Sequence, residues 1–249
     1  MAVVIPLTGW LLQRFHVRTV FLVAMTTFSL GTLLAAVSPG FGLLVTGRVV
    51  QAVGTAIMMP LLMTTILTTV APERRGRMMG TISIVISVAP AIGPTVSGLI
   101  LQDLGWRWMF WIVLPIALTS LALGAVWVRN VTTPGRPPLD VLSVVLSAVA
   151  FAGLIYGLSS IGESAAGHAP VAPWIPVTVG AIGLVAFVAR QLALRERALM
   201  DLRAFGTPAF SIAVGLVAVS MMALFGTLIL LPIYLQTVLG RTTLETGLV

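Results

Sequence analysis

The chain has 249 residues, of which 58% are hydrophobic and only 8% are charged, whereas soluble domains are roughly one quarter charged. This composition excludes a soluble globular domain and predicts a membrane protein. The formal net charge of +7 does not indicate a nucleic-acid-binding protein, because the basic residues are scattered between long uncharged segments.

Eight apolar segments follow one another along the chain. A helix needs about twenty apolar residues to cross the hydrocarbon layer of a membrane. The first segment is too short to cross, and we interpret it as the second half of a helix whose beginning is absent. The sequence therefore predicts an all-α fold, a polytopic transmembrane helix bundle, with apolar segments at 1–12, 19–37, 42–70, 78–101, 107–128, 139–160, 174–192 and 209–236.

The arginines predict how these segments are oriented. If successive segments cross the membrane alternately, eleven arginines lie in the connections on one side and two on the other. By the positive-inside rule the first side is cytoplasmic, in a multi-pass protein of the inner or plasma membrane. The eleven are Arg14, Arg18, Arg74, Arg75, Arg77, Arg129, Arg136, Arg190, Arg195, Arg197 and Arg203, and the two are Arg107 and Arg241.

Two of the cytoplasmic connections carry further signals. The segment RNVTTPGRPPLD has Pro and Gly residues that cannot continue a helix, and it separates five crossings from three, so it is the best candidate for a boundary between bundles. The basic segment RQLALRERALMDLRAFGTP has Leu, Ala and Met between its charges. It predicts either an interfacial amphipathic helix or an ordinary charged loop.

One arginine lies inside an apolar segment. Arg48 is about six residues, or roughly 9 Å, from the outer end of its predicted helix, where a charge is costly unless it pairs, faces water or extends to the interface. Gln51 and Thr55 follow at one-turn spacings and share its face. We interpret this polar stripe as facing a bundle interior or an aqueous cavity; the alternative is an arginine that extends to the membrane surface.

The next apolar segment contains small residues and prolines at a regular spacing. Two rows repeat every fourth residue and form a flat strip, against which another helix can pack closely. The prolines bend the axis, so the helix either pivots or is a kinked packing helix. The strip consists of Ala89, Pro90, Gly93, Pro94, Ser97 and Gly98.

Two shorter motifs supply further candidate residues. GWLLQRFHVR places Arg14 and Arg18 beside Gly9 at the first cytoplasmic turn, where a topology signal is the alternative explanation. LPIYLQTVLG places Tyr234 and Gln236 at the outer end of the last segment, where they either line a cavity or form an interfacial anchor.

The interiors of the apolar segments contain no Asp, Glu, His or Lys, so they offer no nucleophile with an acid and a base. The chain also has no cysteine and only two histidines, which leaves little from which to build a metal site. We therefore expect no enzyme, no catalytic residues, no metal and no cofactor.

These motifs together resemble the major facilitator superfamily, specifically its fourteen-span drug:proton antiporter branch. GWLLQRFHVR resembles the family's loop between helices two and three, GRVVQAVGTA the helix-four motif, and APAIGPTVSG the antiporter motif of helix five. GWRWMFWIVLP, ALMDLRAF and LPIYLQTVLGRTTLETGL continue the likeness in order. The resemblance implies an incomplete major facilitator fold, a fragment covering part of helix two through helix nine.

The resemblance also implies a division of the chain. Residues 1–128 would form an N-terminal bundle, from partial helix two to helix six, and 139–192 the extra helix pair of this branch. Residues 129–138 would be a cytoplasmic linker, 193–208 a cytoplasmic connection, and 209–249 the start of a C-terminal bundle.

The function implied is proton-coupled export of small amphipathic drug-like compounds by alternating access. Arg48, Gln51 and Thr55 would line the substrate and proton-coupling cavity. The small-residue strip would pack helices in the resting state, and Gly9, Arg14 and Arg18 would form a gating loop. The partners would be membrane lipid, protons, a small-molecule substrate and the missing parts of the full-length chain.

Two other hypotheses belong to different classes. The chain is a truncated product without transport activity of its own, with at most an interaction role, because the family's acid-bearing first helix is missing. Alternatively it forms a passive channel, for which the sequence shows no ring of like polar residues.

Overall fold

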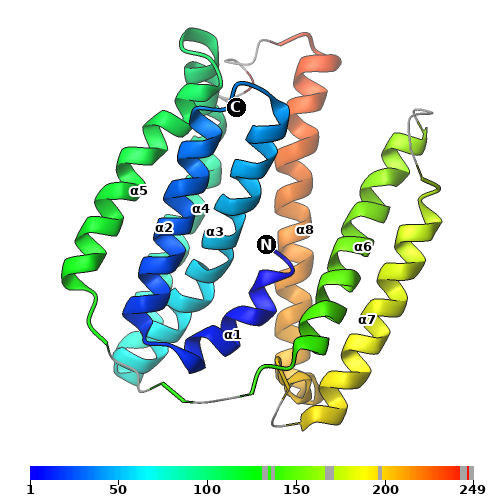
Figure 1. Cartoon of the computed structure of the whole chain (residues 1–249). Helices are drawn as coiled ribbons and strands as arrows, with labels where there is room; N and C mark the ends of the chain where they lie inside the picture. The colour runs from blue at the N-terminus through cyan, green and yellow to red at the C-terminus, as the bar shows by residue number, and fades with distance from the viewer. Residues whose placement is uncertain (131–133, 136–137, 166–170, 196–197, 242–245, 247–249) are drawn as a thin grey trace.

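The computed structural model describes residues 1–130, 134–135, 138–165, 171–195, 198–241 and 246. These residues form eight α-helices and one short 3-10 helix, with no strand among them (Figure 1). The elements are α1 (Val4–Arg14), α2 (Val17–Ala36), α3 (Phe41–Thr69), α4 (Pro72–Asp103), α5 (Arg107–Trp127), α6 (Val141–Ala165), α7 (Trp174–Leu194), η2 (Leu202–Gly206) and α8 (Pro208–Thr237).

Seven helices of the described chain, α2 to α8, are long and apolar enough to cross a membrane. The helix α1 has 11 residues and is too short to do so, as the sequence predicts. The all-α class and the multi-pass character are therefore confirmed. The predicted division into bundles, linker and extra helix pair stays a prediction.

The largest error in the predicted boundaries is at the start of α4. The sequence placed residues 71–78 in a connection, whereas the helix begins at Pro72. Pro72 stands at the first helical position, where its fixed φ and missing N–H suit a helix start, and Glu73 lies in the first turn. Arg75 donates hydrogen bonds to the carbonyl oxygens of Val70 (3.0 Å) and Leu67 (2.7 Å), which fix α4 to the end of α3.

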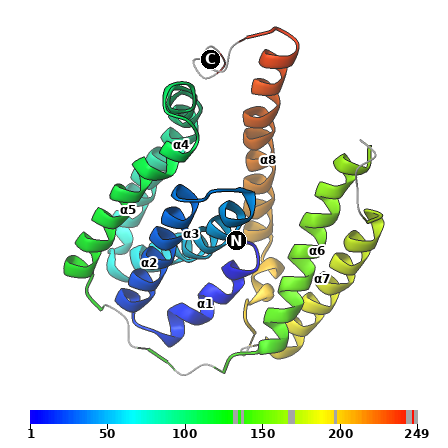
Figure 2. The same cartoon turned by 45° about the horizontal axis from the view of Figure 1, so that its top comes forward.

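Figures 1 and 2 show two groups of helices. In the first group α2 packs against both α3 and α5, and α1 packs against α3. The helix α4 runs beside α3 and α5 with fewer contacts. In the second group α6 and α7 form an antiparallel pair. The helix α8 stands between the two groups and contacts η2, the short helix before it.

Glycine allows the two closest helix pairs to approach backbone to backbone. A Cβ atom added at Gly31 of α2 would lie 2.3 Å from the backbone nitrogen of Gln51 in α3. A Cβ at Gly54 would lie 2.4 Å from the carbonyl oxygen of Ala24. In the second pair, a Cβ at Gly180 would lie 2.4 Å from the nitrogen of Leu154. Small residues serve this purpose in membranes, where lipid supplies no hydrophobic drive between helices.

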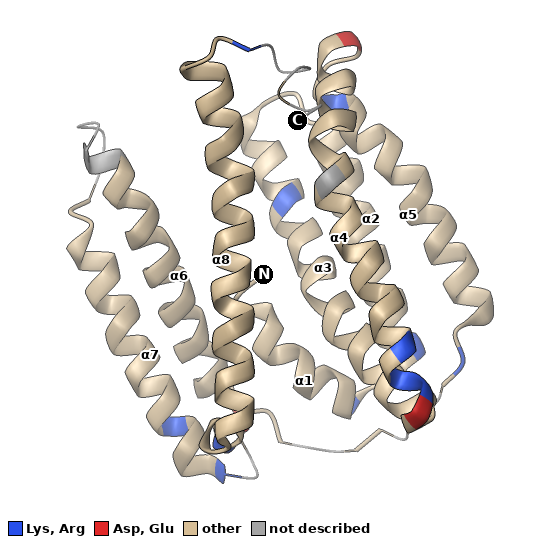
Figure 3. Cartoon of the chain, turned by 180° about the vertical axis from the view of Figure 1, so that it is seen from behind, with Lys and Arg blue, Asp and Glu red and all other residues tan. Residues whose placement is uncertain are grey.

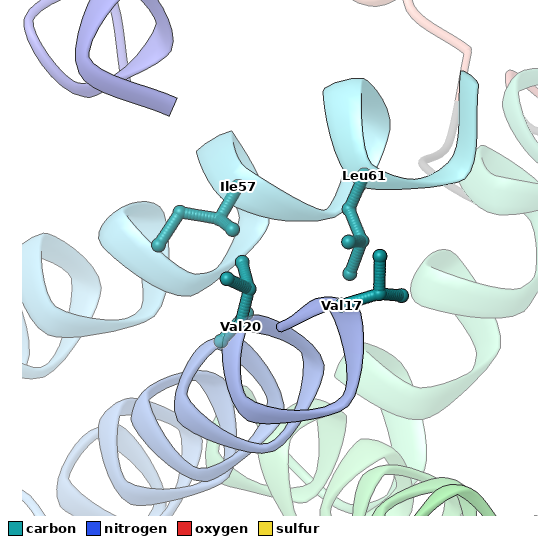
Figure 4. Close-up of a cluster of buried hydrophobic side chains, with 5 residues drawn as sticks. Val17, Val20, Ile57 and Leu61 are labelled. Atoms are coloured by element: carbon teal, nitrogen blue, oxygen red, sulfur yellow. The ribbon is translucent and has the colours of Figure 1, made fainter. Parts of the chain in front are cut away.

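A cluster of buried side chains holds α2 and α3 together near one end. Val17 and Val20 of α2 pack with Ile57 and Leu61 of α3 (Figure 4), and Ala24 completes the cluster. Each of the five is less than 5% exposed. The cluster joins the same two helices as the glycine contacts, and Ala24 belongs to the cluster and also faces Gly54.

Basic residues gather mostly at one end of the helices (Figure 3). We call this the Arg-rich end. By the helix bounds it contains the end of α1 with Arg14, the start of α2 with Arg18, the start of α4 with Arg74, Arg75 and Arg77, and the end of α7 with Arg190. Arg136 and Arg197 lie outside the described residues. The interfacial helix predicted as one alternative for 190–208 is wrong for the described part, because α7 ends at Leu194 and η2 has only 5 residues.

Candidate functional site: a cavity between two helices

A cavity of about 630 Å³ lies between α3 and α5, and Arg48 and Gln51 provide its polar end. The rest of the lining is apolar or aromatic, and comes from Leu44, Trp106, Met109, Phe110 and Val113. Small-molecule sites have this composition, with a few polar groups in an apolar wall.

The polar end of the cavity is a chain of hydrogen bonds that joins α3 to α2. Arg48 Nη1 donates to Gln51 Oε1 at 2.7 Å. Gln51 Nε2 donates to Thr32 Oγ1 at 2.9 Å, and Thr32 Oγ1 donates to the carbonyl oxygen of Phe28 at 2.8 Å. Arg48 also lies over the ring of Phe110 at 5.8 Å from its centroid. This distance is within the range of a cation–π contact.

The three residues of the predicted stripe differ in exposure. Gln51 is 8% exposed, Thr55 is half-buried, and Arg48 is exposed. Thr55 Oγ1 donates to the backbone oxygen of Gln51 at 3.0 Å and does not line the cavity. The structure therefore brings Arg48 and Gln51 together and leaves Thr55 as part of the helix that carries them.

Two contacts hold the walls in place. Arg107 donates from Nε and Nη2 to the carbonyl oxygen of Ser38, at 3.1 and 2.9 Å. This pair of bonds ties the start of α5 to the turn between α2 and α3. Trp106 and Phe110 lie in the same segment as Arg107, and the packing of α5 on α2 also holds this segment in place.

The small-residue strip of α4 borders a second cavity. This cavity of about 220 Å³ is lined on one side by Pro94, Ser97 and Gly98. On the other side it is lined by Pro232 and Gln236 of α8. The strip thus faces α8 across a space.

Gly98 of this strip is buried whereas Gly93 is exposed, and the packing role of the strip stays a prediction. No heavy atom lies within 4 Å of a Cβ added at Gly93. Ala89 and Pro94 are exposed and Pro90 is half-buried. The helix α4 continues through Pro90 and Pro94.

The remaining candidates have more limited contacts. Arg18 Nη2 donates to the carbonyl oxygen of Ala125 at 2.6 Å and so ties α2 to the end of α5. Arg14 is exposed in the last turn of α1. A Cβ at Gly9 would lie 3.8 Å from the carbonyl oxygen of Leu199, an ordinary contact. Tyr234 is 51% exposed and does not line the cavity to which Gln236 contributes.

Sequence reasoning missed Thr32 and Phe110. Both come from other helices than Arg48, and the spacing of residues within one helix does not reveal a partner on another. A signal was present for Thr32, because it follows Gly31 in a helix rich in small residues. Among the described residues there is also no group of three His, Cys, Asp or Glu that could hold a metal ion.

Comparison with known proteins identifies the family. Residues 1–249 match the family model of the Major Facilitator Superfamily. The chain belongs to this superfamily. It is 45% identical over its whole length to the lincomycin resistance protein LmrB of Listeria monocytogenes serovar 1/2a. It is 42% identical to LmrB of Bacillus subtilis, and 33% identical to the multidrug resistance protein B homolog of Mycobacterium tuberculosis.

The chain spans about half the length of these curated relatives. It covers 52% of the Listeria protein and 46% of the Mycobacterium protein. The resemblance to the major facilitator superfamily read from the motifs is thereby confirmed. The relatives in this family include proteins described as MFS-type transporters.

Proposed function

We propose that the chain forms part of a transporter that exports small amphipathic drug-like compounds from the cell in exchange for protons. The observation that carries the proposal is the cavity between α3 and α5, whose apolar wall ends at Arg48 and Gln51. The names of the relatives, which refer to lincomycin and multidrug resistance, support the same class of substrate.

The roles of the residues follow from this proposal. Arg48 and Gln51 contact the compound or respond to a proton held nearby, because a cation in a membrane helix biases the charge state of its surroundings. The strip that contains Gly93, Pro94 and Gly98 borders the space toward α8, and a movement of the two helices relative to each other would open or close it. Such a two-state movement is how alternating access operates.

The test is uptake into inverted membrane vesicles with an imposed pH gradient. We would use a chimera in which residues 1–249 replace the matched half of the Listeria LmrB protein, with radiolabelled lincomycin as the probe. Gradient-driven accumulation is expected in the chimera, and its loss is expected with Arg48→Ala at unchanged protein level. Arg129→Ala is the matched control, because Arg129 is an exposed arginine outside the helices.

Two outcomes would contradict the proposal. Full accumulation with Arg48→Ala would remove the role of this residue, and uptake that ignores the pH gradient would indicate a channel. The alternative of a chain without transport activity of its own is tested by reconstituting residues 1–249 alone. Accumulation in those vesicles would contradict that alternative.

A further inference from the structure

The orientation of the Gln51 side-chain amide is set by its two neighbours. Arginine carries only donors, so the amide atom at 2.7 Å from Arg48 Nη1 must be the oxygen. The amide nitrogen then points to Thr32 Oγ1 at 2.9 Å. Because the Thr32 hydroxyl gives its own hydrogen to the carbonyl oxygen of Phe28, its oxygen is available to accept this bond.

Thr32 is well placed to fix this arrangement. It is fully buried at 0% exposure, and it belongs to α2, whereas Arg48 and Gln51 belong to α3. Gly31, the residue before it, lets the backbone of α3 approach closely enough for the bond to form. Loss of the Thr32 oxygen would leave the buried amide nitrogen without this acceptor, a costly state, and the amide would turn away from Arg48.

These hydrogen bonds determine which polar group of the cavity a ligand can contact. Gln51 is 8% exposed and both ends of its amide are engaged, so the charged group that the cavity offers to a ligand is the guanidinium of Arg48. This group has five N–H donors and no acceptor, and only one donor is used in the bond to Gln51. No carboxylate lines the cavity, so a ligand amine finds no opposite charge among these lining residues.

We propose that this cavity binds aromatic compounds through an acceptor oxygen, a carbonyl or carboxylate, placed on Arg48, and that Thr32 is the positioning residue that holds Gln51 and Arg48 in this state. The aromatic body packs against Trp106 and Phe110, and the oxygen receives hydrogen bonds from the guanidinium. The inference rests on the proposed function only in taking this cavity as the substrate site.

The test is equilibrium binding to the chain in lipid nanodiscs, with empty nanodiscs as the blank. Three tritiated probes share one ring system: 2-acetylnaphthalene has a carbonyl, 2-ethylnaphthalene lacks it, and 2-(aminomethyl)naphthalene carries an amine. The acetyl probe is expected to bind roughly tenfold more tightly than the ethyl probe, since hydrogen bonds to charged groups are among the stronger ones. The amine is expected to bind most weakly.

Variants separate the two parts of the proposal. Arg48→Met removes the donors and should reduce the preference for the acetyl over the ethyl probe to about one, by the loss of that same hydrogen bond. Thr32→Val keeps the shape but lacks the hydroxyl and should lower the preference severalfold, whereas Thr32→Ser keeps the oxygen and should restore it. The ratio of the two affinities is the readout, because a general loss of folding would weaken both probes alike.

Three results would overturn the proposal. Equal affinity for the acetyl and ethyl probes, or tighter binding of the amine, would exclude an acceptor-selective site. An unchanged preference in Thr32→Val would exclude the positioning role. The proposed transport function fails separately, since a chain can show this binding preference without moving any compound across a membrane.

Discussion

At the scale of single residues, one ion pair ties α6 to α7 at the Arg-rich end. Arg190 donates from Nε and Nη2 to the two carboxylate oxygens of Asp140, at 2.7 and 2.8 Å. This bidentate geometry is the favourable one for arginine and carboxylate. The hydrogen bond from Arg190 lowers the pKa of Asp140 from 3.8 to about 2. Gln191, the next residue, is 2% exposed and donates to Ser143 Oγ at 2.6 Å, which adds a second link between the same helices.

Substitution of Asp140 by asparagine should destabilise this helix pair. The side chain of Asp140 is 18% exposed and that of Arg190 34%, so solvent screens the pair and we expect a loss of about 1 kcal/mol, or roughly 2–4 °C in Tm. The measurement is thermal unfolding in detergent at pH 7. Asp201→Asn is the control, because Asp201 and Arg203 are more than half exposed at 57% and 51%, and it should leave Tm unchanged.

The same pair gives a pH dependence. The pKa of Asp140 is lower in the folded chain than its ordinary value of 3.8, so the folded state favours the ionised carboxylate. Its contribution to stability is complete above pH 3.8 and is lost as the pH falls through about 2. The difference in Tm between the wild-type chain and Asp140→Asn should therefore shrink and disappear as the pH falls from 3.8 through about 2. A difference that stays constant down to pH 2 would contradict the role of the ionised pair.

The position of Arg48 and Gln51 on one face could be read from the sequence, because a spacing of three residues is fixed by helix geometry. Thr32 and Phe110 could not, since their contacts depend on how α2, α3 and α5 pack. For Thr55 the spacing predicted the face correctly but not the hydrogen bond. Its hydroxyl donates to the backbone oxygen of Gln51 in its own helix, and residue spacing does not determine which acceptor a hydroxyl uses.

At the scale of helices, the contact between α2 and α3 depends on Gly31. Gly31→Ala should force these helices apart, because the added Cβ would lie 2.3 Å from a backbone nitrogen that cannot move aside. We expect a loss of about 1–3 kcal/mol, measured by unfolding of the purified chain. Gly226→Ala in α8 is the matched control. Nothing lies within 4 Å of its added Cβ, and alanine favours a helix over glycine, so no loss is expected.

Equal unfolding curves for Gly31→Ala and Gly226→Ala would show that the close approach of α2 and α3 is not required.

The existence and type of all the long helices were predicted from the sequence, because runs of about twenty apolar residues are a strong signal. The sequence did not predict which helices pack against one another. Gly31 and Gly93 look alike in the sequence, but only Gly31 faces another backbone, and the neighbours of a small residue are decided by the packing of the whole bundle.

At the scale of the whole molecule, the helix order sets which connections share an end. Short turns join α2 to α3 and α3 to α4, so Gly40 and Gly76 lie near opposite ends of the long helix α3. The predicted orientation puts Gly76, within the cluster of Arg74, Arg75 and Arg77, in the cytoplasm. Gly40 then lies on the opposite, extracytoplasmic side of the membrane.

Single cysteines can decide this orientation, because the chain has no cysteine of its own. Gly40→Cys and Gly76→Cys form a matched pair: both positions are exposed, and no atom lies within 4 Å of a Cβ at either. A membrane-impermeant maleimide should label Gly40→Cys in intact bacterial cells. It should label Gly76→Cys only after the cells are made permeable. The reverse pattern would show that the excess of arginine does not set the topology, and labelling of both in intact cells would contradict a crossing by α3.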